Sequence, residues 1–137
     1  MSLVLDSSAT LAWIYQDEVG DLPAKIFGLV VASGASVPSL WRLEVANGLC
    51  NGVRRGRIDL ADRDAALADL SRLRIDVDPD TDRQAWTATM RLADRFGLTL
   101  YDAAYLELSQ RRALPLASFD QPLCAAARAL GVAVIGD

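Results

Sequence analysis

Short continuous hydrophobic runs alternate with longer helical patterns along the chain. The first run, Leu3–Leu5, is apolar at every position, as expected of a strand that is buried on both faces of a sheet. Similar short runs recur at residues 35–37, 75–77, 114–119 and 132–135. Strands that alternate with helices in this way predict an α/β fold, in which helices cover both faces of a parallel sheet.

Residues that favour helix ends bound the helical stretches. Ser39 is positioned to cap a helix that runs to about Arg55, and Asp120 is positioned to cap the last helix. The segment Thr81–Gln84 has the form of a capping box, which predicts one helix from there to Gly97. Together these signals predict helices over residues 8–15, 21–33, 39–55, 59–73, 81–97, 102–112 and 120–131.

The composition is that of a protein with a sizeable core. Of the 137 residues, 52% are hydrophobic, and no linker, repeat or low-complexity segment divides the chain, so we expect a single domain over residues 1–137. No hydrophobic run is long enough to span a bilayer, and no pattern typical of a signal peptide is present. The sequence therefore predicts a cytoplasmic protein without a membrane partner.

The chain contains no histidine, which excludes several kinds of catalysis at once. Ser-His-Asp and Cys-His nucleophiles, histidine general bases and the common zinc sites are all ruled out. Any chemistry must use carboxylates, hydroxyls, arginines or a bound ion. Because the net charge is −4, contacts with phosphate groups must come from a local cationic patch rather than from the whole surface.

Four carboxylates stand where chemistry is expected. Asp6 follows the first strand and Asp120 follows the fourth, so both leave a parallel sheet at its carboxyl edge, where α/β proteins bind ligands. Glu44 lies in a polar strip inside the third predicted helix, and Asp102 opens the sixth. Carboxylates gathered within a few ångströms repel one another unless a hard cation such as Mg²⁺ or Mn²⁺ neutralises them. The four acids together therefore predict a metal site.

Each acid also has a purely structural interpretation. Asp6 and Asp120 are good helix N-caps, and Asp102 near a helix start is favoured by the helix dipole. Glu44 can belong to an ordinary solvated helix face. The hypothesis of a metal site depends on all four acids, not on any one of them.

The segments around these acids resemble those of PIN-domain ribonucleases, specifically the VapC toxins of toxin–antitoxin systems. The resemblance is carried by Asp6–Ala9, Glu44–Leu49, Ala93–Leu106 and Leu116–Asp120, the last followed by Leu123 and Ala125. The third segment is the longest and most specific, and the four extend over essentially the whole chain. The resemblance implies a three-layer α/β/α fold with a central parallel five-stranded sheet in the order 3-2-1-4-5.

The same resemblance implies the roles of particular residues. The metal-binding and catalytic acids of the family correspond to Asp6, Glu44, Asp102 and Asp120. Ser8 and Ser118 match positions where the family has hydroxyls that support the acids. Some relatives have a further acid just after the fourth, whereas this chain has Gln121 and Pro122, which leaves open whether one or two ions bind.

The implied activity is metal-dependent hydrolysis of RNA. Mg²⁺ or Mn²⁺ lowers the pKa of a bound water, which then attacks phosphorus in line, and we expect 5′-phosphate and 3′-hydroxyl ends. Arg54 and Arg55, close to Arg57, are candidate contacts for the RNA backbone, as are Arg111 and Arg112. Favourable charge at the C-terminal ends of two helices is the alternative explanation for these arginines.

Partners also follow from the resemblance. VapC relatives form homodimers and bind a VapB-type antitoxin. We expect any contact with DNA to be made by the antitoxin and not by this chain. Trp13 and Trp41 are candidate apolar contacts for a helical antitoxin tail, with ordinary core packing as the alternative.

Two other functions remain open from the sequence. One is a catalytically inactive PIN-like module that only binds a partner. The other is a phosphohydrolase of the haloacid dehalogenase type, which also begins from an acid after the first strand. That family needs a second aspartate two residues later and a downstream lysine, whereas this chain has Ser8 and the single lysine Lys25.

Overall fold

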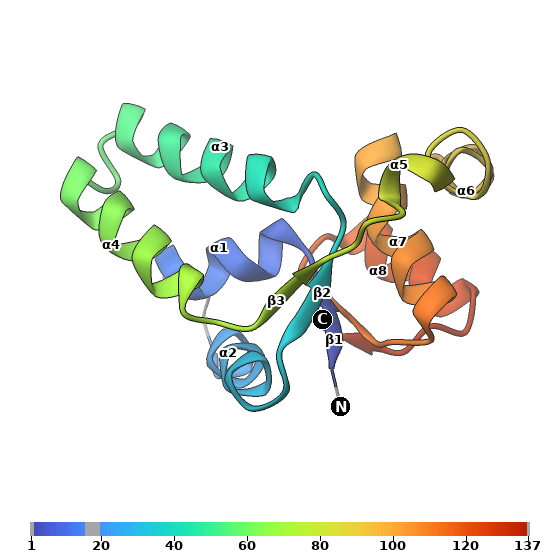
Figure 1. The fold of residues 1–137 in the computed structure, drawn as a ribbon, viewed down its shortest axis with the longest axis horizontal. Coiled ribbons are helices and arrows are strands. Elements are labelled where there is room, and N and C mark those ends of the chain that lie inside the picture. The colour runs from blue at the N-terminus through green and yellow to red at the C-terminus, as the bar shows by residue number, and fades with distance from the viewer. Residues whose placement is uncertain (1, 16–19, 137) are drawn as a thin grey trace.

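A sheet of five parallel strands forms the centre of the computed structural model, which describes residues 2–15 and 20–136 (Figure 1). The strands are β1 (Leu3–Leu5), β2 (Ala35–Val37), β3 (Ile75–Val77), β4 (Leu116–Ala117) and β5 (Val134–Ile135). Their order is β3-β2-β1-β4-β5, and every neighbouring pair is parallel. The predicted α/β fold and strand order are confirmed, although β4 and β5 are shorter than the hydrophobic runs suggested.

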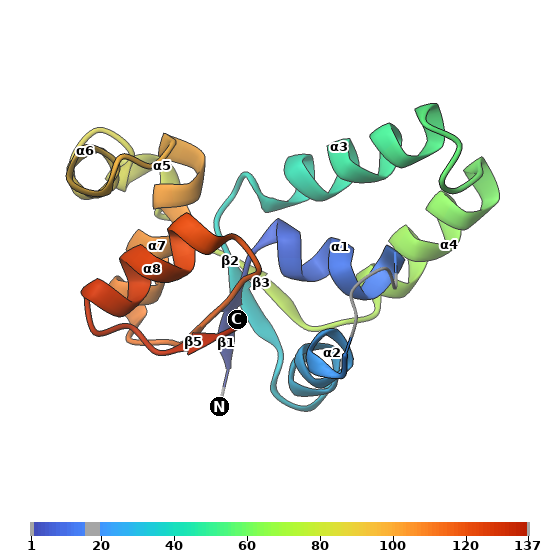
Figure 2. The same ribbon diagram turned by 180° about the vertical axis from the view of Figure 1, so that it is seen from behind.

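Helices cover both faces of this sheet and make the structure three layers thick. They are α1 (Ser7–Tyr15), α2 (Leu22–Ser33), α3 (Trp41–Arg54), α4 (Leu60–Ser71), α5 (Thr81–Gln84), α6 (Ala88–Phe96), α7 (Leu100–Arg112) and α8 (Gln121–Ala129). The first four lie on one side of the strands and the last four on the other, as Figures 1 and 2 show from opposite directions. Within the described part of the chain, no helix has the length and apolarity needed to cross a bilayer.

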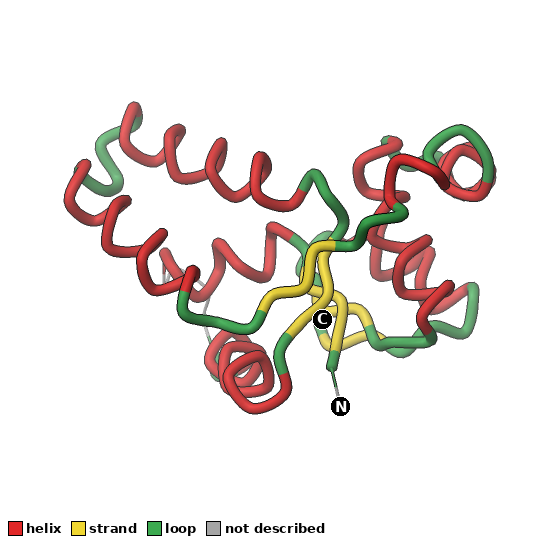
Figure 3. Tube along the Cα trace, in the orientation of Figure 1, coloured by secondary structure: helices red, strands yellow, loops and turns green. Residues whose placement is uncertain are grey.

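The core is built around β1 and α7. All three residues of β1 are buried, because β1 pairs with β2 on one side and with β4 on the other. Helix α7 buries a continuous run of residues, from Ala103 to Ser109. Figure 3 shows the helices on either side of the central strands. The carboxyl ends of β1 and β4 mark the point where the strand order reverses, which is the usual ligand-binding position of an open α/β sheet.

Two glycines allow α3 to lie directly against α1. A Cβ atom on Gly48 would be 2.5 Å from a methyl carbon of Leu11, and one on Gly52 would overlap the hydroxyl of Tyr15. The Tyr15 hydroxyl instead donates a hydrogen bond to the Gly48 carbonyl, at 2.7 Å. This close approach sets the position of the helix that carries Glu44.

Two predicted helix caps, at Thr81 and Ser39, are wrong. Thr81 does not begin a capping box: its hydroxyl donates to Asp78 at 3.0 Å and accepts from the Ser39 amide at 3.1 Å. Ser39 does not cap α3 either, because the N-cap of that helix is Leu40, without a side-chain hydrogen bond. The single helix predicted over 81–97 is also divided into α5 and α6, with a turn at residues 85–87.

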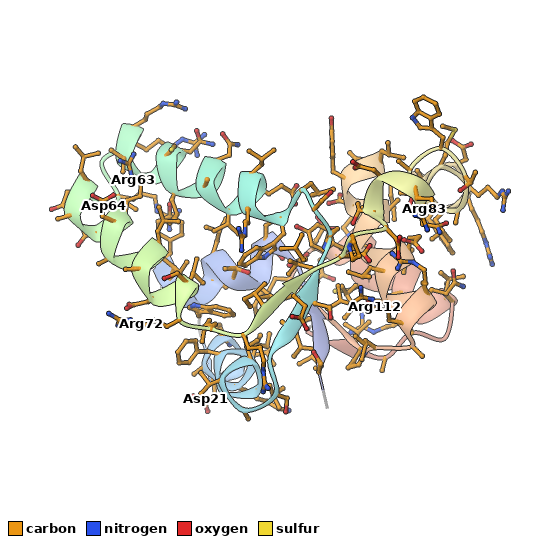
Figure 4. The ribbon with its side chains drawn as sticks, in the orientation of Figure 1. Asp21, Arg63, Asp64, Arg72, Arg83 and Arg112 are labelled. Carbon is orange, nitrogen blue, oxygen red and sulfur yellow. The ribbon has the colours of Figure 1, made fainter. Side chains whose placement is uncertain are left out.

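A cluster of ion pairs joins the end of α7 to the sheet. Asp78, whose side chain is 0% exposed, accepts hydrogen bonds from Arg111 at 2.6 Å and from Arg112 at 2.9 Å. Arg111 also donates to Glu107, and Arg112 donates to the Ser36 hydroxyl on β2. Figure 4 labels Arg112 beside α7. Both arginines belong to this cluster, which gives them a structural role; that they line a groove for RNA stays a prediction.

This cluster should contribute strongly to stability. Burial alone would raise the pKa of Asp78, but hydrogen bonds from Arg111 and Thr81 outweigh it and hold that pKa below its ordinary value. We expect Asp78→Ala to lower the free energy of unfolding by about 3 kcal/mol, because it removes the buried carboxylate that Arg111 and Arg112 share. Urea unfolding at pH 7 measures this. The exposed Asp76→Ala is the matched control, and a loss under about 1 kcal/mol would contradict the account.

Candidate active site

Asp6 lies directly after β1, at the carboxyl edge of the sheet. Its side chain is only 3% exposed. Oδ1 accepts hydrogen bonds from the Ser8 hydroxyl at 2.6 Å and from the Ala9 amide at 2.9 Å, while Oδ2 accepts from the Ser118 hydroxyl at 2.5 Å. Asp6 thus caps the first turn of α1, and the same hydrogen bonds fix the direction of its carboxylate.

The environment of Asp6 disfavours a negative charge. Burial raises the pKa of Asp6 from its ordinary 3.8 to about 6, with a further contribution from the charge of Asp120, although three hydrogen bonds oppose the rise. A carboxylate held in this way is stabilised by a cation that it can bind.

Asp120 reaches the same edge from β4. Its Oδ1 accepts from the Leu123 amide at 2.9 Å and caps α8, as the sequence predicted. The Asp120 amide donates to the Ser118 hydroxyl at 3.0 Å, and that hydroxyl donates to Asp6. Ser8 makes a matching link, because its hydroxyl accepts from the Phe119 amide at 3.0 Å. Both predicted serines therefore tie the two strand ends together.

Asp102 comes to the site on the first turn of α7. It is not the N-cap of this helix: Thr99 is, and its hydroxyl accepts from the Asp102 amide at 3.1 Å. Burial raises the pKa of the Asp102 carboxyl, and the charges of Asp120 and then Glu44 raise it further. Asp102 therefore lies within electrostatic reach of both acids.

Glu44 lies in the first turn of α3 and points toward α7. Its Oε1 accepts a hydrogen bond from the Tyr105 hydroxyl at 2.6 Å and a longer one from the Ser7 hydroxyl at 3.4 Å. The pKa of Tyr105 rises well above its ordinary value, first through burial and then through this bond and the charges of Glu44 and Asp6. Glu44 is thus not on a solvated helix face but turned inward among the other acids.

The structure brings all four predicted acids to one edge of the sheet, and no cationic side chain among residues 2–15 and 20–136 pairs with them. As the side chains lie, no three acidic groups of the described residues are close enough together to bind one ion. Three of the acids instead accept hydrogen bonds from protein donors.

The set of side chains nevertheless fits a divalent cation. It offers carboxylate oxygens and hydroxyls, which hard ions such as Mg²⁺ and Mn²⁺ prefer, and no imidazole. Asp6 adds a buried charge without a cationic partner among the residues described. Asp6, Glu44, Asp102 and Asp120 are therefore the residues that could hold a metal.

The arginines predicted to contact RNA lie farther away, at the end of α3. Arg55 lines a groove of about 380 Å³ between α1 and α3, together with Ser8, Asn51 and Arg57. Arg57 stacks over the Tyr15 ring, 4.1 Å from its centre. Arg54 lies outside this lining, is exposed, and donates to the Asn51 side chain at 3.1 Å.

Sequence reasoning assigned no role to two residues that contact Glu44. Tyr105 follows Asp102 by three positions, so both lie on one face of a helix, and this spacing could have placed the hydroxyl at the site. Ser7 lies beside Asp6 but offered no comparable signal, because its contact with Glu44 depends on how α3 packs against α1.

Comparisons with known proteins identify the family and the fold. The sequence model of the family described as "PIN domain" matches residues 3–129. The crystal structure of PAE2754 from Pyrobaculum aerophilum is similar with a TM-score of 0.71 and 26% identity, covering 98% of this chain and 84% of that one. No curated protein sequence matches the chain.

Two further solved structures share the fold at lower identity. VapBC2 from Rickettsia felis, bound to a DNA fragment from their promoter, has a TM-score of 0.66 and 14% identity, covering 100% of this chain and 99% of that one. VapC20 from Mycobacterium tuberculosis, described as a toxin that cleaves the sarcin–ricin loop, has a TM-score of 0.58 and 20% identity, covering 90% and 94%.

Proposed function

Because this chain belongs to the PIN-domain family, we propose that it is a metal-dependent endoribonuclease and the toxin of a VapBC-type pair acting in the cytoplasm. The observation that carries the proposal is that four acids lie at one edge of the sheet, and none has a cationic partner among the described residues. One of these acids, Asp6, is buried. The haloacid dehalogenase interpretation is dropped with this family assignment.

Different residues of this chain have different roles in the proposed reaction. Asp6 and Asp102 would be the main ligands for Mg²⁺ or Mn²⁺, and Asp120 and Glu44 would bind it directly or through water. When bound, the cation supplies positive charge for the phosphate and makes a water acidic enough to act as the nucleophile. Ser8 and Ser118 hold Asp6 by both oxygens, so its carboxylate does not have to reorient during the reaction.

Analysis of the cleaved ends tests this mechanism. Water attack on phosphorus needs no 2′-hydroxyl, so digestion of RNA with Mg²⁺ or Mn²⁺ should yield 5′-phosphate and 3′-hydroxyl ends. Finding 2′,3′-cyclic phosphate ends would reject the mechanism. A PIN-like module that only binds a partner would leave RNA intact under all metal conditions.

The arginines at the end of α3 are proposed to contact RNA away from the cleaved bond. Arg55 follows Glu44 by eleven positions, which corresponds to about 16 Å along a helix. A residue at that distance contacts a flanking phosphate rather than the scissile one. The groove that Arg55 lines also includes Ser8, so it leads toward Asp6.

Removing Arg54 and Arg55 together should flatten the salt dependence of RNA binding. Each lost contact with a single-stranded phosphate lowers the slope of log K against log salt by about 0.7, so the double alanine variant should lose about 1.4. Binding of a single-stranded oligoribonucleotide is measured in the Asp6→Asn background to prevent cleavage. The exposed Arg91→Ala serves as the control, and an unchanged slope in the double variant removes both arginines from the substrate site.

A groove of about 900 Å³ between α1, α2 and α4 supports the proposal of a VapB-type antitoxin. Trp13 and Phe27 line it, with ring centres 5.4 Å apart. Its apolar lining suits a helix with an apolar face. Trp41 does not contribute, because it is buried and its indole nitrogen donates to Thr10.

A homodimer is proposed on the opposite side of the molecule. Trp86, in the turn between α5 and α6, is 84% exposed, and Met90 on α6 is also exposed. Large apolar side chains exposed together mark a protein contact. DNA is proposed to reach this chain only through the antitoxin, because the net charge of −4 does not favour direct binding.

A further inference from the structure

The hydroxyl of Tyr105 is a polar group in an otherwise apolar position. Tyr105 is 1% exposed and is among the largest fully buried side chains. It lies on α7, whose buried face packs against the sheet, and its hydroxyl reaches across to α3. A buried hydroxyl must find a hydrogen-bond partner to avoid a free-energy cost of about 1–3 kcal/mol. Here the acceptor is the carboxylate of Glu44.

The hydrogen bond is short and involves a charged acceptor. Tyr105 Oη lies 2.6 Å from Glu44 Oε1, a distance typical of a hydroxyl that donates to an ionised carboxylate. Ser7 donates to the same oxygen from α1. Both donors therefore bind Oε1, and no hydrogen bond within the described chain engages Oε2.

Tyr105 also links Glu44 to the rest of the acid cluster. It follows Asp102 by three positions on the same helix, and the negative charges of both Glu44 and Asp6 act on its hydroxyl. Helix α7 thus carries Asp102 and, one turn later, the Tyr105 hydroxyl that binds Glu44. Glu44, on a different helix, is kept in fixed relation to Asp102 by this contact.

We propose that Tyr105 is a positioning residue of the metal site: its hydroxyl holds Oε1 of Glu44, so that Oε2 is the oxygen through which Glu44 meets the cation or its water. This inference rests on the proposed metal-dependent activity. Glu44 then acts through one oxygen and does not chelate. A purely structural hydroxyl would stabilise the fold without affecting how the protein binds a divalent ion.

Isothermal titration calorimetry of the whole protein with Mn²⁺ as the only ligand tests the proposal. Tyr105→Phe removes one oxygen and keeps the ring that fills the core. We expect the dissociation constant for Mn²⁺ to rise about tenfold, the effect of about 1.4 kcal/mol expected from one hydrogen bond to a charged group. Tyr101→Phe is the matched control, because Tyr101 lies on the same helix, is 62% exposed, and should bind Mn²⁺ like the unmodified protein.

A double-mutant cycle separates positioning from a structural role. If Tyr105 acts through Glu44, Tyr105→Phe will weaken Mn²⁺ binding in the unmodified protein but have no further effect in the Glu44→Gln background. Equal effects in the two backgrounds, or an unchanged Mn²⁺ affinity in Tyr105→Phe, would overturn the proposal. Mn²⁺ binding that is absent in the unmodified protein, or unaffected by Asp6→Asn, would instead reject the metal site itself.

A second variant keeps the test decisive if Tyr105→Phe does not fold. Glu44→Asp keeps the charge but shortens the side chain by one carbon, so one carboxylate can no longer reach Tyr105 and the cation together. We expect it to bind Mn²⁺ as weakly as Glu44→Gln does. Affinity equal to that of the unmodified protein would show that the position of this carboxylate is unimportant and would overturn the proposal.

Discussion

Asp6→Asn should lower RNA cleavage about a thousandfold or more while leaving the protein folded. The substitution keeps the size of the side chain and an oxygen that can accept from Ser118 or Ser8, but it removes the charge that binds the cation. Loss of about 4 kcal/mol of transition-state stabilisation corresponds to three orders of magnitude in rate. Cleavage of a fluorescent oligoribonucleotide under single-turnover conditions with Mn²⁺ measures the effect.

The control for this variant is Asp21→Asn, at an exposed acid beside α2 that makes no side-chain cap hydrogen bond. It changes the net charge by the same amount and should leave cleavage within about twofold of the unmodified rate. Retention of a tenth or more of the activity by Asp6→Asn would contradict the assignment of Asp6 as a metal ligand.

Stability of the metal-free protein should fall as the pH rises from about 4 to above 6. The pKa of Asp6 is about 6 in the folded protein and near 3.8 when unfolded. Between these values the folded state binds more protons, so the free energy of unfolding decreases with rising pH. A shift of about two units corresponds to about 3 kcal/mol. The raised pKa of Asp102 acts in the same direction.

Saturating Mn²⁺ should oppose this loss, because the cation binds the ionised carboxylates. Urea unfolding at a series of pH values, with Mn²⁺ and with a chelator, measures both curves. In Asp6→Asn the fall between pH 4 and 6 should shrink to the part that Asp102 contributes. A metal-free stability that rises through this window would show that burial of Asp6 does not have the stated effect. Asp78, whose pKa is lowered, causes a loss of stability only at more acidic pH.

Hydrophobic patterning was enough to predict the sheet, because β1 and β2 are apolar or small at every position and are buried throughout. It did not predict the break between α5 and α6 or the true start of α3. The Thr81 hydroxyl does not cap α5, because it donates to Asp78 and accepts from the Ser39 amide, which the fold brings near from 42 positions away. Local capping rules cannot anticipate the contact with Ser39, because only the folded chain brings that residue near Thr81.

The positions of Asp6 and Asp120 at the carboxyl edge of the sheet could be predicted from the sequence, because an aspartate that caps a helix there can also face a ligand. Asp6 and Asp120 do cap helices, and those hydrogen bonds are what orient them at the edge of the sheet. The contact between Tyr105 and Glu44 was not predictable in the same way, because it depends on how α7 lies relative to α3. For Arg111 and Arg112, charge at a helix end gave no information about the buried Asp78 that binds them.

Anomalous diffraction from crystals soaked in Mn²⁺ tests the central claim most directly, because it locates the ion independently of activity. The account predicts an anomalous peak at the carboxyl edge of the sheet, within coordination distance of Asp6 and Asp102. Peaks confined to other acids, such as the exposed pair Asp59 and Asp62 at the start of α4, with none beside a well-ordered Asp6, would contradict it.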